Sequence, residues 1–307
     1  MTNIFENSTN SNLFKDYATK IDEKGYIFLP KALSQDFISN IKKDISKHRN
    51  NFNNNRLGGV SLRTQYFNTF LLAISRSFYN YCTSKFVLEL SNQIFQRDDF
   101  RLKALRFYET SSGHNMQWHT DTKTPEGFKS IPGIIFICYV SDVPKGEFQY
   151  IEGSHKWSQK KLDNDFDEDF INKHYSKRIK SFKGSSGDLI IYNTAGIHRA
   201  SPYHDKSFKR SSLFFQVDCE NNSEPIYLNS SFIDPSNKKI MKYLGFGEPS
   251  NYQEYPICSA EFAPTILILR QVIFPKSKGL LIELLKFLLP IKRLKILIDK
   301  FKNFKKK

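Results

Sequence analysis

The stretch IIFICYV, residues 134–140, is an uninterrupted run of apolar side chains, most of them β-branched or aromatic. A run of about four to eight such residues between turn-forming residues is typical of a buried β-strand. Comparable runs, separated by Gly, Pro, Ser and Asp, recur at Leu102–Tyr108, Phe148–Ile151, Asp188–Tyr192 and Ser212–Val217. We therefore expect several short strands that form a β-sandwich or jelly roll at about residues 100–220.

Helical patterns come before this β-rich part of the chain. Residues 1–20 are expected to form a frayed or helical lead-in, and Gly25–Pro30 a short strand that the proline ends. Ser34 is expected to cap a helix with apolar residues at helical spacing, namely Phe37, Ile38, Ile41 and Ile45. We expect an Asn-rich loop at residues 49–60 and two helices at residues 66–96. This order predicts an α+β fold in which helices flank a jelly-roll (cupin-like) core.

The C-terminal part has a different character. Residues 221–260 contain four prolines and are expected to be irregular, whereas residues 277–307 return to a helical pattern. We divide the chain into a main domain at residues 1–275 and a basic amphipathic helical tail at residues 276–307. The tail holds 11 lysines and arginines and only two acidic residues. Two interpretations are open: a helix that packs on the β core or on a second subunit, or a helix that lies on an anionic membrane surface.

The composition indicates a folded protein in a reducing setting. Among 307 residues there are 28 Phe and 15 Tyr, more aromatic side chains than disordered chains carry. The four cysteines form no Cys-x-x-Cys pair, so we expect no disulfide framework or zinc knuckle, and a cytoplasmic location. Neither a signal peptide nor an apolar run of about 18 residues is evident. The net charge of +15 is concentrated in the tail and, without a basic–aromatic stacking motif, does not predict nucleic-acid binding.

Three residues that are remote in sequence form the pattern of a metal site. His119 and Asp121 are two residues apart, so on an extended chain their side chains point to the same side. His198 follows the expected strand at Asp188–Tyr192 and can join the pair if the strands lie side by side. Two histidines and one carboxylate on one face of an octahedral metal leave open positions that suit Fe(II), O2 and a chelating co-substrate. We expect His119, Asp121 and His198 to be metal ligands and to form the catalytic centre.

A cation for the co-substrate follows the distal histidine. Arg210 lies twelve residues after His198, and its planar guanidinium can bind a distal carboxylate through two hydrogen bonds. Ser212 shares the strand face of Arg210 and can donate a further hydrogen bond, whereas Lys209 faces away. Gln117 has the strand parity of His119 and is expected to touch co-substrate or substrate.

Four stretches resemble the phytanoyl-CoA dioxygenase-like (PhyH-like) family of Fe(II)/2-oxoglutarate-dependent oxygenases. They are the strand and helix start at Gly25–Ser34, the dyad His119-Thr120-Asp121, the turn Gly153-Ser154-His155 and the segment from Gly187 to Arg210. The similarity covers about residues 20–220. The segment Lys145–Phe148 departs from the Asn-Gly run that usually precedes the Gly-Ser-His turn, which concerns the substrate-facing rim and not the metal.

The resemblance implies a double-stranded β-helix with helices packed outside it. It also implies a dioxygenase reaction: Fe(II) binds 2-oxoglutarate, Arg210 holds its far carboxylate, and O2 converts it to succinate and CO2 while a substrate C–H bond is hydroxylated. Asp121 favours hydroxylation because related halogenases lack this carboxylate, although desaturation and ring closure stay open. The expected substrate is a small molecule, a lipid or a glycan.

Two alternatives belong to other functional classes. The chain could be a catalytically idle jelly-roll binding module, against which the intact set of ligand candidates and Arg210 argues. It could also be a cupin-like metal enzyme that does not use 2-oxoglutarate, in which case Arg210→Ala would leave activity largely intact.

Overall fold

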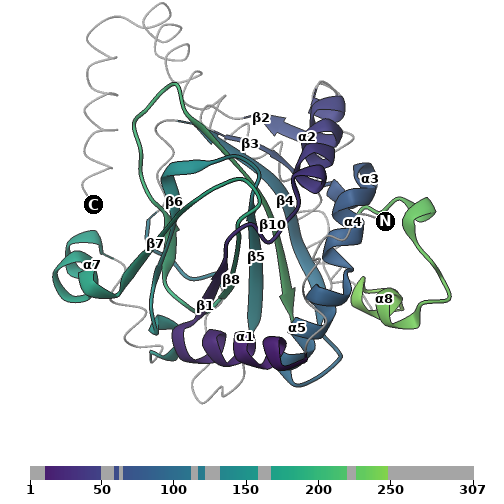
Figure 1. Cartoon of the computed structure of the whole chain (residues 1–307), viewed down its shortest axis with the longest axis horizontal. Coiled ribbons are helices and arrows are strands. Elements are labelled where there is room, and N and C mark those ends of the chain that lie inside the picture. Colours follow the sequence, from purple (N-terminus) through teal and green to yellow (C-terminus); the bar gives the residue numbers. More distant parts are fainter. Residues whose placement is uncertain are drawn as a thin grey trace, which may run out of the picture.

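The computed structural model describes residues 11–49, 59–61, 65–111, 117–121, 132–157, 167–219 and 226–247, which form two facing antiparallel sheets with helices outside them (Figure 1). The large sheet has the strand order β1 (Tyr26–Leu29), β8 (Leu189–Asn193), β5 (Gly133–Tyr139), β10 (Lys209–Asp218), β4 (Arg101–Ser111), β3 (Gln65–Asn68) and β2 (Gly59–Ser61). The small sheet has the order β7 (Ile179–Gly184), β6 (Val143–Ile151) and β9 (His198–Ala200). This arrangement confirms the expected α+β fold with a jelly-roll core.

Side-chain alternation gives the large sheet an inner and an outer face. On β10, Leu213 and Phe215 pack into the main hydrophobic core, whereas Ser212 and Phe214 line a cavity between the sheets. β10 pairs with both β4 and β5, so it lies in the middle of the sheet. A second apolar cluster lies between the two sheets, and its buried members are Ile135, Tyr139, Val143, Phe148, Tyr150, Phe182, Ile190 and Tyr192.

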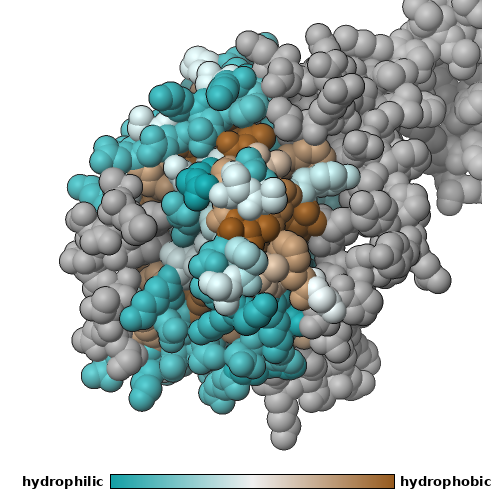
Figure 2. All heavy atoms as spheres, turned by 90° about the vertical axis from the view of Figure 1, so that its right-hand side faces the viewer, coloured by the Kyte–Doolittle hydropathy of each residue, from teal (hydrophilic) through white to brown (hydrophobic). Residues whose placement is uncertain are grey.

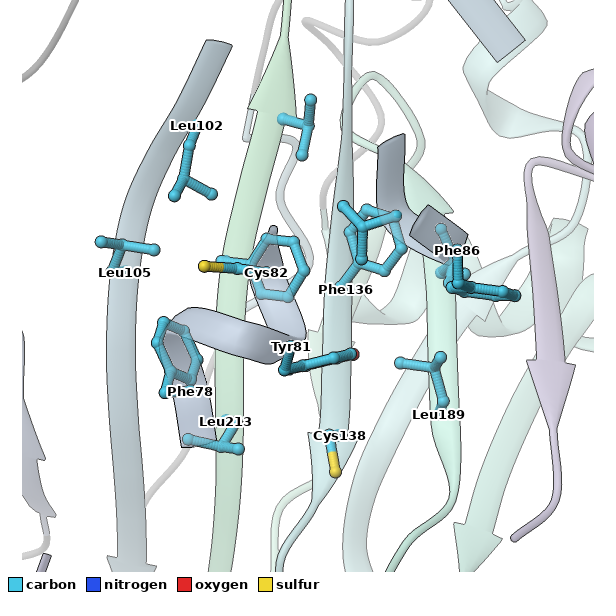
Figure 3. Close-up of a cluster of buried hydrophobic side chains, with 14 of the residues drawn as sticks. Phe78, Tyr81, Cys82, Phe86, Leu102, Leu105, Phe136, Cys138, Leu189 and Leu213 are labelled. Atoms are coloured by element: carbon cyan, nitrogen blue, oxygen red, sulfur yellow. The ribbon is translucent and has the colours of Figure 1, made fainter. Parts of the chain in front are cut away.

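The outer face of the large sheet is covered by the N-terminal helices. These are α1 (Ser11–Lys24), α2 (Gln35–Arg49), α3 (Leu71–Ile74), α4 (Arg76–Cys82) and α5 (Lys85–Phe95). Figure 3 shows the side chains of α4 among those of the strands, and the Tyr81 ring meets the Phe215 ring edge-on at 5.2 Å. Each edge-to-face aromatic pair adds about 0.5–1.5 kcal/mol to the stabilisation from burial alone. This packing stabilises β10 and β5 from the outer face of the large sheet.

Most strand and helix predictions are confirmed. β1, β4, β5, β6, β8 and β10 lie where apolar runs were expected. The hydroxyl of Ser34 accepts a hydrogen bond from the Phe37 amide at 3.2 Å, as expected for the cap of α2. The short strands β7 and β9 were not expected, because their sequences, IKSFKG and HRA, lack an apolar run.

The prediction of two helices at residues 66–96 was wrong. This stretch starts with β3, which pairs with β4, and continues with the three helices α3, α4 and α5. Two serines cause the breaks between the helices: Ser75 accepts a hydrogen bond from the Phe78 amide, and Ser84 from the Val87 amide. Such N-cap contacts end one helix and start the next, which the apolar spacing alone does not reveal.

Two other expectations need smaller corrections. α2 extends to Arg49 and β2 starts at Gly59, so these residues do not belong to the loop expected at residues 49–60. Residues 50–58 lie outside the described part of the chain. The stretch at 221–260, expected to be irregular, contains helix α8 (Lys238–Tyr243), which the side chain of Asn237 caps. Figure 2 shows the face that carries α8, where apolar side chains gather within a polar surround.

The predictions for the C-terminal part concern residues outside the described ranges. The tail at 276–307, its two interpretations and the domain boundary at residue 275 therefore stay predictions. Among the helices of the described ranges, none combines the length and the apolar character that a membrane span requires.

Gly196, in the turn that leads into β9, tolerates no side chain. A Cβ atom added to Gly196 would lie 1.7 Å from the hydroxyl oxygen of Tyr150, a fully buried residue. Gly196→Ala is therefore expected to lower the free energy of unfolding by about 1–3 kcal/mol, as measured by urea denaturation. In a Tyr150→Val background the same substitution should cost much less, and equal costs in both backgrounds would refute the proposed clash.

Candidate metal centre and its cavity

Backbone pairing brings the two histidines together. The amide of His119 donates to the carbonyl of His198 at 3.0 Å, and the amide of His198 donates to that of His119 at 2.9 Å. Through this isolated antiparallel bridge, the segment at 117–121 pairs with the edge of β9 that does not pair with β6. Residues that face each other in such a pair carry their side chains on the same side of the sheet. The imidazole rings accordingly lie with their centroids 4.4 Å apart.

Asp121 completes a compact set of three ligand atoms. One donor atom from each of His119, Asp121 and His198 lies within 4.8 Å of the other two. The distance from His198 Nε2 to Asp121 Oδ2 is 3.2 Å, and that from His119 Nε2 to Asp121 Oδ1 is 3.9 Å. Two ligands at right angles on a metal, each about 2.1 Å from it, are roughly 3 Å apart. The side chains therefore fit one divalent metal ion with little movement.

Backbone carbonyls orient both imidazole rings for this task. His119 Nδ1 lies 2.8 Å from the carbonyl oxygen of Gln117, and His198 Nδ1 lies 3.0 Å from that of Gly196. A carbonyl only accepts, so Nδ1 carries a proton in each ring, and Nε2 is the ring atom that can bind a metal. Such outer hydrogen bonds fix the tautomer and the direction of metal-binding histidines.

Charge and burial favour the metal-binding protonation states of His119 and Asp121. Burial, followed by the neighbouring His198, lowers the pKa of His119, which favours its neutral form. Burial alone would raise the pKa of the Asp121 carboxyl, but His198 and a hydrogen bond from Tyr192 outweigh it and lower that pKa. Burial and the charge of Asp121 raise the pKa of Tyr192 well above its ordinary value. Its hydroxyl therefore keeps its proton and donates to Asp121 Oδ2 at 2.8 Å.

The three side chains lie at one wall of a cavity of about 170 Å³ between the two sheets. Strands of both sheets contribute to its lining, which comprises Arg106, Tyr108, His119, Asp121, Ile137, Tyr139, Phe148, Tyr192, His198, Arg199, Ala200, Arg210, Ser212 and Phe214. Half of these lining residues are aromatic or aliphatic and half are charged or polar, so the cavity combines apolar walls with several polar groups that can orient a small molecule.

Arg210 and Ser212 lie on the inner face of β10 and both line the cavity. Both residues are buried, and one guanidinium nitrogen of Arg210 donates to the carbonyl of Gly146. Among the residues that the structure describes, none accepts a hydrogen bond from the Nε–H of Arg210. An unsatisfied buried donor is costly, so this nitrogen is suited to an acceptor that enters the cavity.

Gln117 occupies a different position from the other expected site residues. Its side chain is exposed and is not part of the cavity lining, whereas its backbone carbonyl orients His119. Contact between its side chain and a co-substrate stays a prediction. Trp118, which has the opposite strand parity to His119, is 2% exposed, and the guanidinium of Arg199 covers its ring at 4.2 Å.

Sequence reasoning missed Tyr192, which bridges the metal-ligand candidates. Its hydroxyl contacts Asp121 and lies 3.3 Å from His198 Nε2. Along the chain Tyr192 is only the last member of the apolar run at 188–192. Its parity would have placed it with Ile190 on the inner face, but parity alone did not reveal that Asp121 lies opposite.

Comparisons with known proteins identify the family. The family model described as phytanoyl-CoA dioxygenase (PhyH) matches residues 21–211. HygX from Streptomyces hygroscopicus, solved with nickel and 2-oxoglutarate bound, is 16% identical, with a TM-score of 0.51 over 68% of this chain and 88% of its own. EctD from S. alaskensis, solved with bound Fe, is 16% identical, with a TM-score of 0.55 over 81% of this chain and 88% of its own.

A third solved structure has the same fold and a different reaction in its description. SnoK, a non-heme alpha ketoglutarate dependent carbocyclase from nogalamycin biosynthesis, is 13% identical, with a TM-score of 0.52 over 72% of this chain and 91% of its own. No curated protein sequence matches the chain. The match at residues 21–211 covers β9 and the segment at 117–121, which carry the ligand candidates, as well as Arg210. The chain belongs to the phytanoyl-CoA dioxygenase (PhyH) family of oxygenases.

Proposed function

We propose that the chain is a non-haem Fe(II)/2-oxoglutarate-dependent dioxygenase that hydroxylates a C–H bond of a small molecule, lipid or glycan. In this proposal His119, Asp121 and His198 bind the metal. One observation carries the proposal: the Nε2 atoms of two imidazoles and one carboxylate converge at the wall of a cavity that also contains Arg210. When bound, Fe(II), 2-oxoglutarate and O2 supply the oxidising power for the reaction.

The remaining residues of the cavity bind, orient and exclude water. Arg210 has a free Nε–H and Ser212 a hydroxyl on the same strand face, so together they can hold the distal carboxylate of 2-oxoglutarate. Phe148 and Phe214 add apolar wall. Such walls keep water away from a reactive centre and strengthen the electrostatic contacts inside it.

The reaction outcome is the finer part of this proposal. Neighbours of the same fold include a carbocyclase and, in SnoN, an alpha ketoglutarate dependent epimerase, so the fold supports more than one outcome. Asp121 supports hydroxylation, because it occupies a coordination position that a halide would otherwise need. Product analysis by mass spectrometry distinguishes a gain of one oxygen atom from the loss of two hydrogens.

A titration of the full chain tests the proposal. Anaerobic addition of 2-oxoglutarate to the Fe(II)-loaded protein should produce the visible metal-to-ligand absorption band, and air should then release succinate. Succinate should be absent when Fe(II) is withheld. No band and no succinate would leave a binding module, whereas turnover without 2-oxoglutarate would indicate a cupin-like metal enzyme.

Tyr192 offers a test of how the ligands are positioned. Tyr192→Phe removes the hydroxyl that donates to Asp121 at 2.8 Å. We expect metal affinity to fall about 10- to 100-fold, because outer hydrogen bonds hold metal ligands in their binding orientation. Anaerobic Co(II) titration measures the loss. Tyr150→Phe is the matched control, since its equally buried hydroxyl contacts the carbonyl of Asn193 instead; equal affinities in both variants would contradict a role for Tyr192.

A further inference from the structure

Arg106 is a third arginine in the cavity lining, beside Arg199 and Arg210. It lies on β4, and its guanidinium covers the ring of Phe214 at 4.4 Å. Its side chain is solvent-exposed and lines the cavity, and among the described residues no carboxylate pairs with it. Stacking on an aromatic ring holds the guanidinium plane and leaves its N–H groups available to a ligand.

The two other arginines of the cavity are already engaged. Arg210 donates to the carbonyl of Gly146, and Arg199 pairs with Glu168 while its Nε donates to the side chain of Gln149 at 2.9 Å. Arg199 also covers the ring of Trp118. Arg106 is thus the cavity arginine without a polar partner in the described parts of the chain.

Strand register separates Arg106 from the proposed co-substrate site. Arg210 pairs with Thr110 across β10 and β4, and Arg106 pairs with Phe214. Arg106 therefore lies four residues further along the sheet than Arg210, about 14 Å at the usual rise per residue. This places the two cations at different ends of the inner face.

Charge balance assigns Arg106 to a different ligand. In the proposed complex, the charges of a divalent metal and Arg210 are neutralised by Asp121 and the two carboxylates of 2-oxoglutarate. Arg106 then remains as an excess positive charge on the cavity lining, and its exposed guanidinium attracts an anionic group of a molecule that enters the cavity.

We propose that Arg106 binds a carboxylate or phosphate group of the primary substrate, so that the substrate is an anionic small molecule. The inference rests on the proposed function, because the charge balance assumes that metal and 2-oxoglutarate are bound. Arg106 then sets which end of the substrate faces the metal, through paired N–H···O contacts to the anion.

Simple anions can test the site before the substrate is known. The full chain is loaded with Mn(II) and saturating 2-oxoglutarate, and inorganic phosphate or ¹³C-acetate is titrated in. Nuclear relaxation of ³¹P or ¹³C then reports anions held near the paramagnetic metal. We expect saturable enhancement for at least one anion, with the two probes distinguishing a phosphate from a carboxylate site. Arg106→Gln should weaken anion binding about 10- to 100-fold, the loss typical of a charge-assisted contact.

Lys209→Gln is the matched control, because Lys209 neighbours Arg210 on β10 but its side chain is mostly exposed. Its Nζ atom lies 3.8 Å from Oε1 of Glu109. The substitution removes the same charge and should leave anion binding unchanged. The affinity of the Fe(II) protein for 2-oxoglutarate, read from the absorption band, should stay within about twofold in Arg106→Gln. A tenfold loss would make Arg106 part of the co-substrate site and overturn the proposal.

The two levels of inference fail in different ways. If the wild-type chain forms the 2-oxoglutarate complex but holds no anion through Arg106, the substrate inference alone is overturned. If the wild-type chain forms no such complex, the proposed function fails and the substrate inference fails with it.

Discussion

Replacement of His198 by alanine is expected to lower Fe(II) affinity by at least about 100-fold and to abolish succinate release. His198 is 3% exposed, and its Nε2 atom lies 3.2 Å from Asp121, so no neighbouring water can readily take its place as a fixed ligand. Loss of a ligand should lower metal affinity more than loss of an outer hydrogen bond, which lowers it about 10- to 100-fold. Anaerobic Fe(II) titration and succinate analysis measure the two effects.

His174→Ala provides the control for this experiment. His174 lies on α7 (Glu168–Tyr175), where its ring contacts Phe170, and it is not one of the grouped ligand candidates. Its replacement should leave Fe(II) affinity and succinate release near the wild-type values. Tight stoichiometric Fe(II) binding by His198→Ala would exclude His198 as a ligand and remove the basis of the proposed centre.

Replacement of Arg210 by alanine is expected to weaken 2-oxoglutarate binding by about 2–4 kcal/mol, roughly 30- to 1000-fold. Arg210 is 6% exposed. Its Nε–H, from which no described residue accepts a hydrogen bond, would bind the distal carboxylate in a largely desolvated setting. Titration of the absorption band with 2-oxoglutarate measures the dissociation constant. Arg210→Lys should recover part of the loss, since it keeps the charge but not the planar fork.

Metal affinity separates this effect from general damage to the site. Arg210 is not a ligand candidate, so Fe(II) affinity without co-substrate should stay within about twofold of wild type. Unchanged 2-oxoglutarate affinity in Arg210→Ala would argue for a metal enzyme that does not use this co-substrate.

The architecture of the site explains how one fold can serve different reactions. The ligand candidates belong to β9 and to the segment at 117–121, on the small-sheet side, whereas Arg106, Arg210 and Ser212 belong to the large sheet. Substitutions on the large sheet can therefore change what is bound without disturbing the metal. The descriptions of SnoK and SnoN, which have this fold, name a carbocyclase and an epimerase.

The local pattern of apolar and polar residues predicted most of the long strands and the residues of the candidate site. Apolar runs such as residues 134–140 predict strands because a buried strand must be apolar along its length, and this holds wherever the strand lies in the sheet. The pairing of His119 with Asp121 follows from strand parity alone. The same local rules missed β9, whose three residues carry no periodicity, and the serine caps that divide residues 66–96.

The sequence by itself therefore predicted the strands that carry apolar runs, but not β2, β3, β7 or β9. It also predicted that His119, Asp121 and His198 have the chemistry of a metal site and that Arg210 and Ser212 share a strand face. Only the tertiary structure decided that His198 pairs with His119, that Tyr192 holds Asp121, and that Arg106 lines the cavity with no carboxylate partner among the described residues. The physical reason is that these relations join strands far apart in the chain. Register between such strands depends on how the two sheets and the covering helices pack together, and residue spacing along one segment carries no record of it.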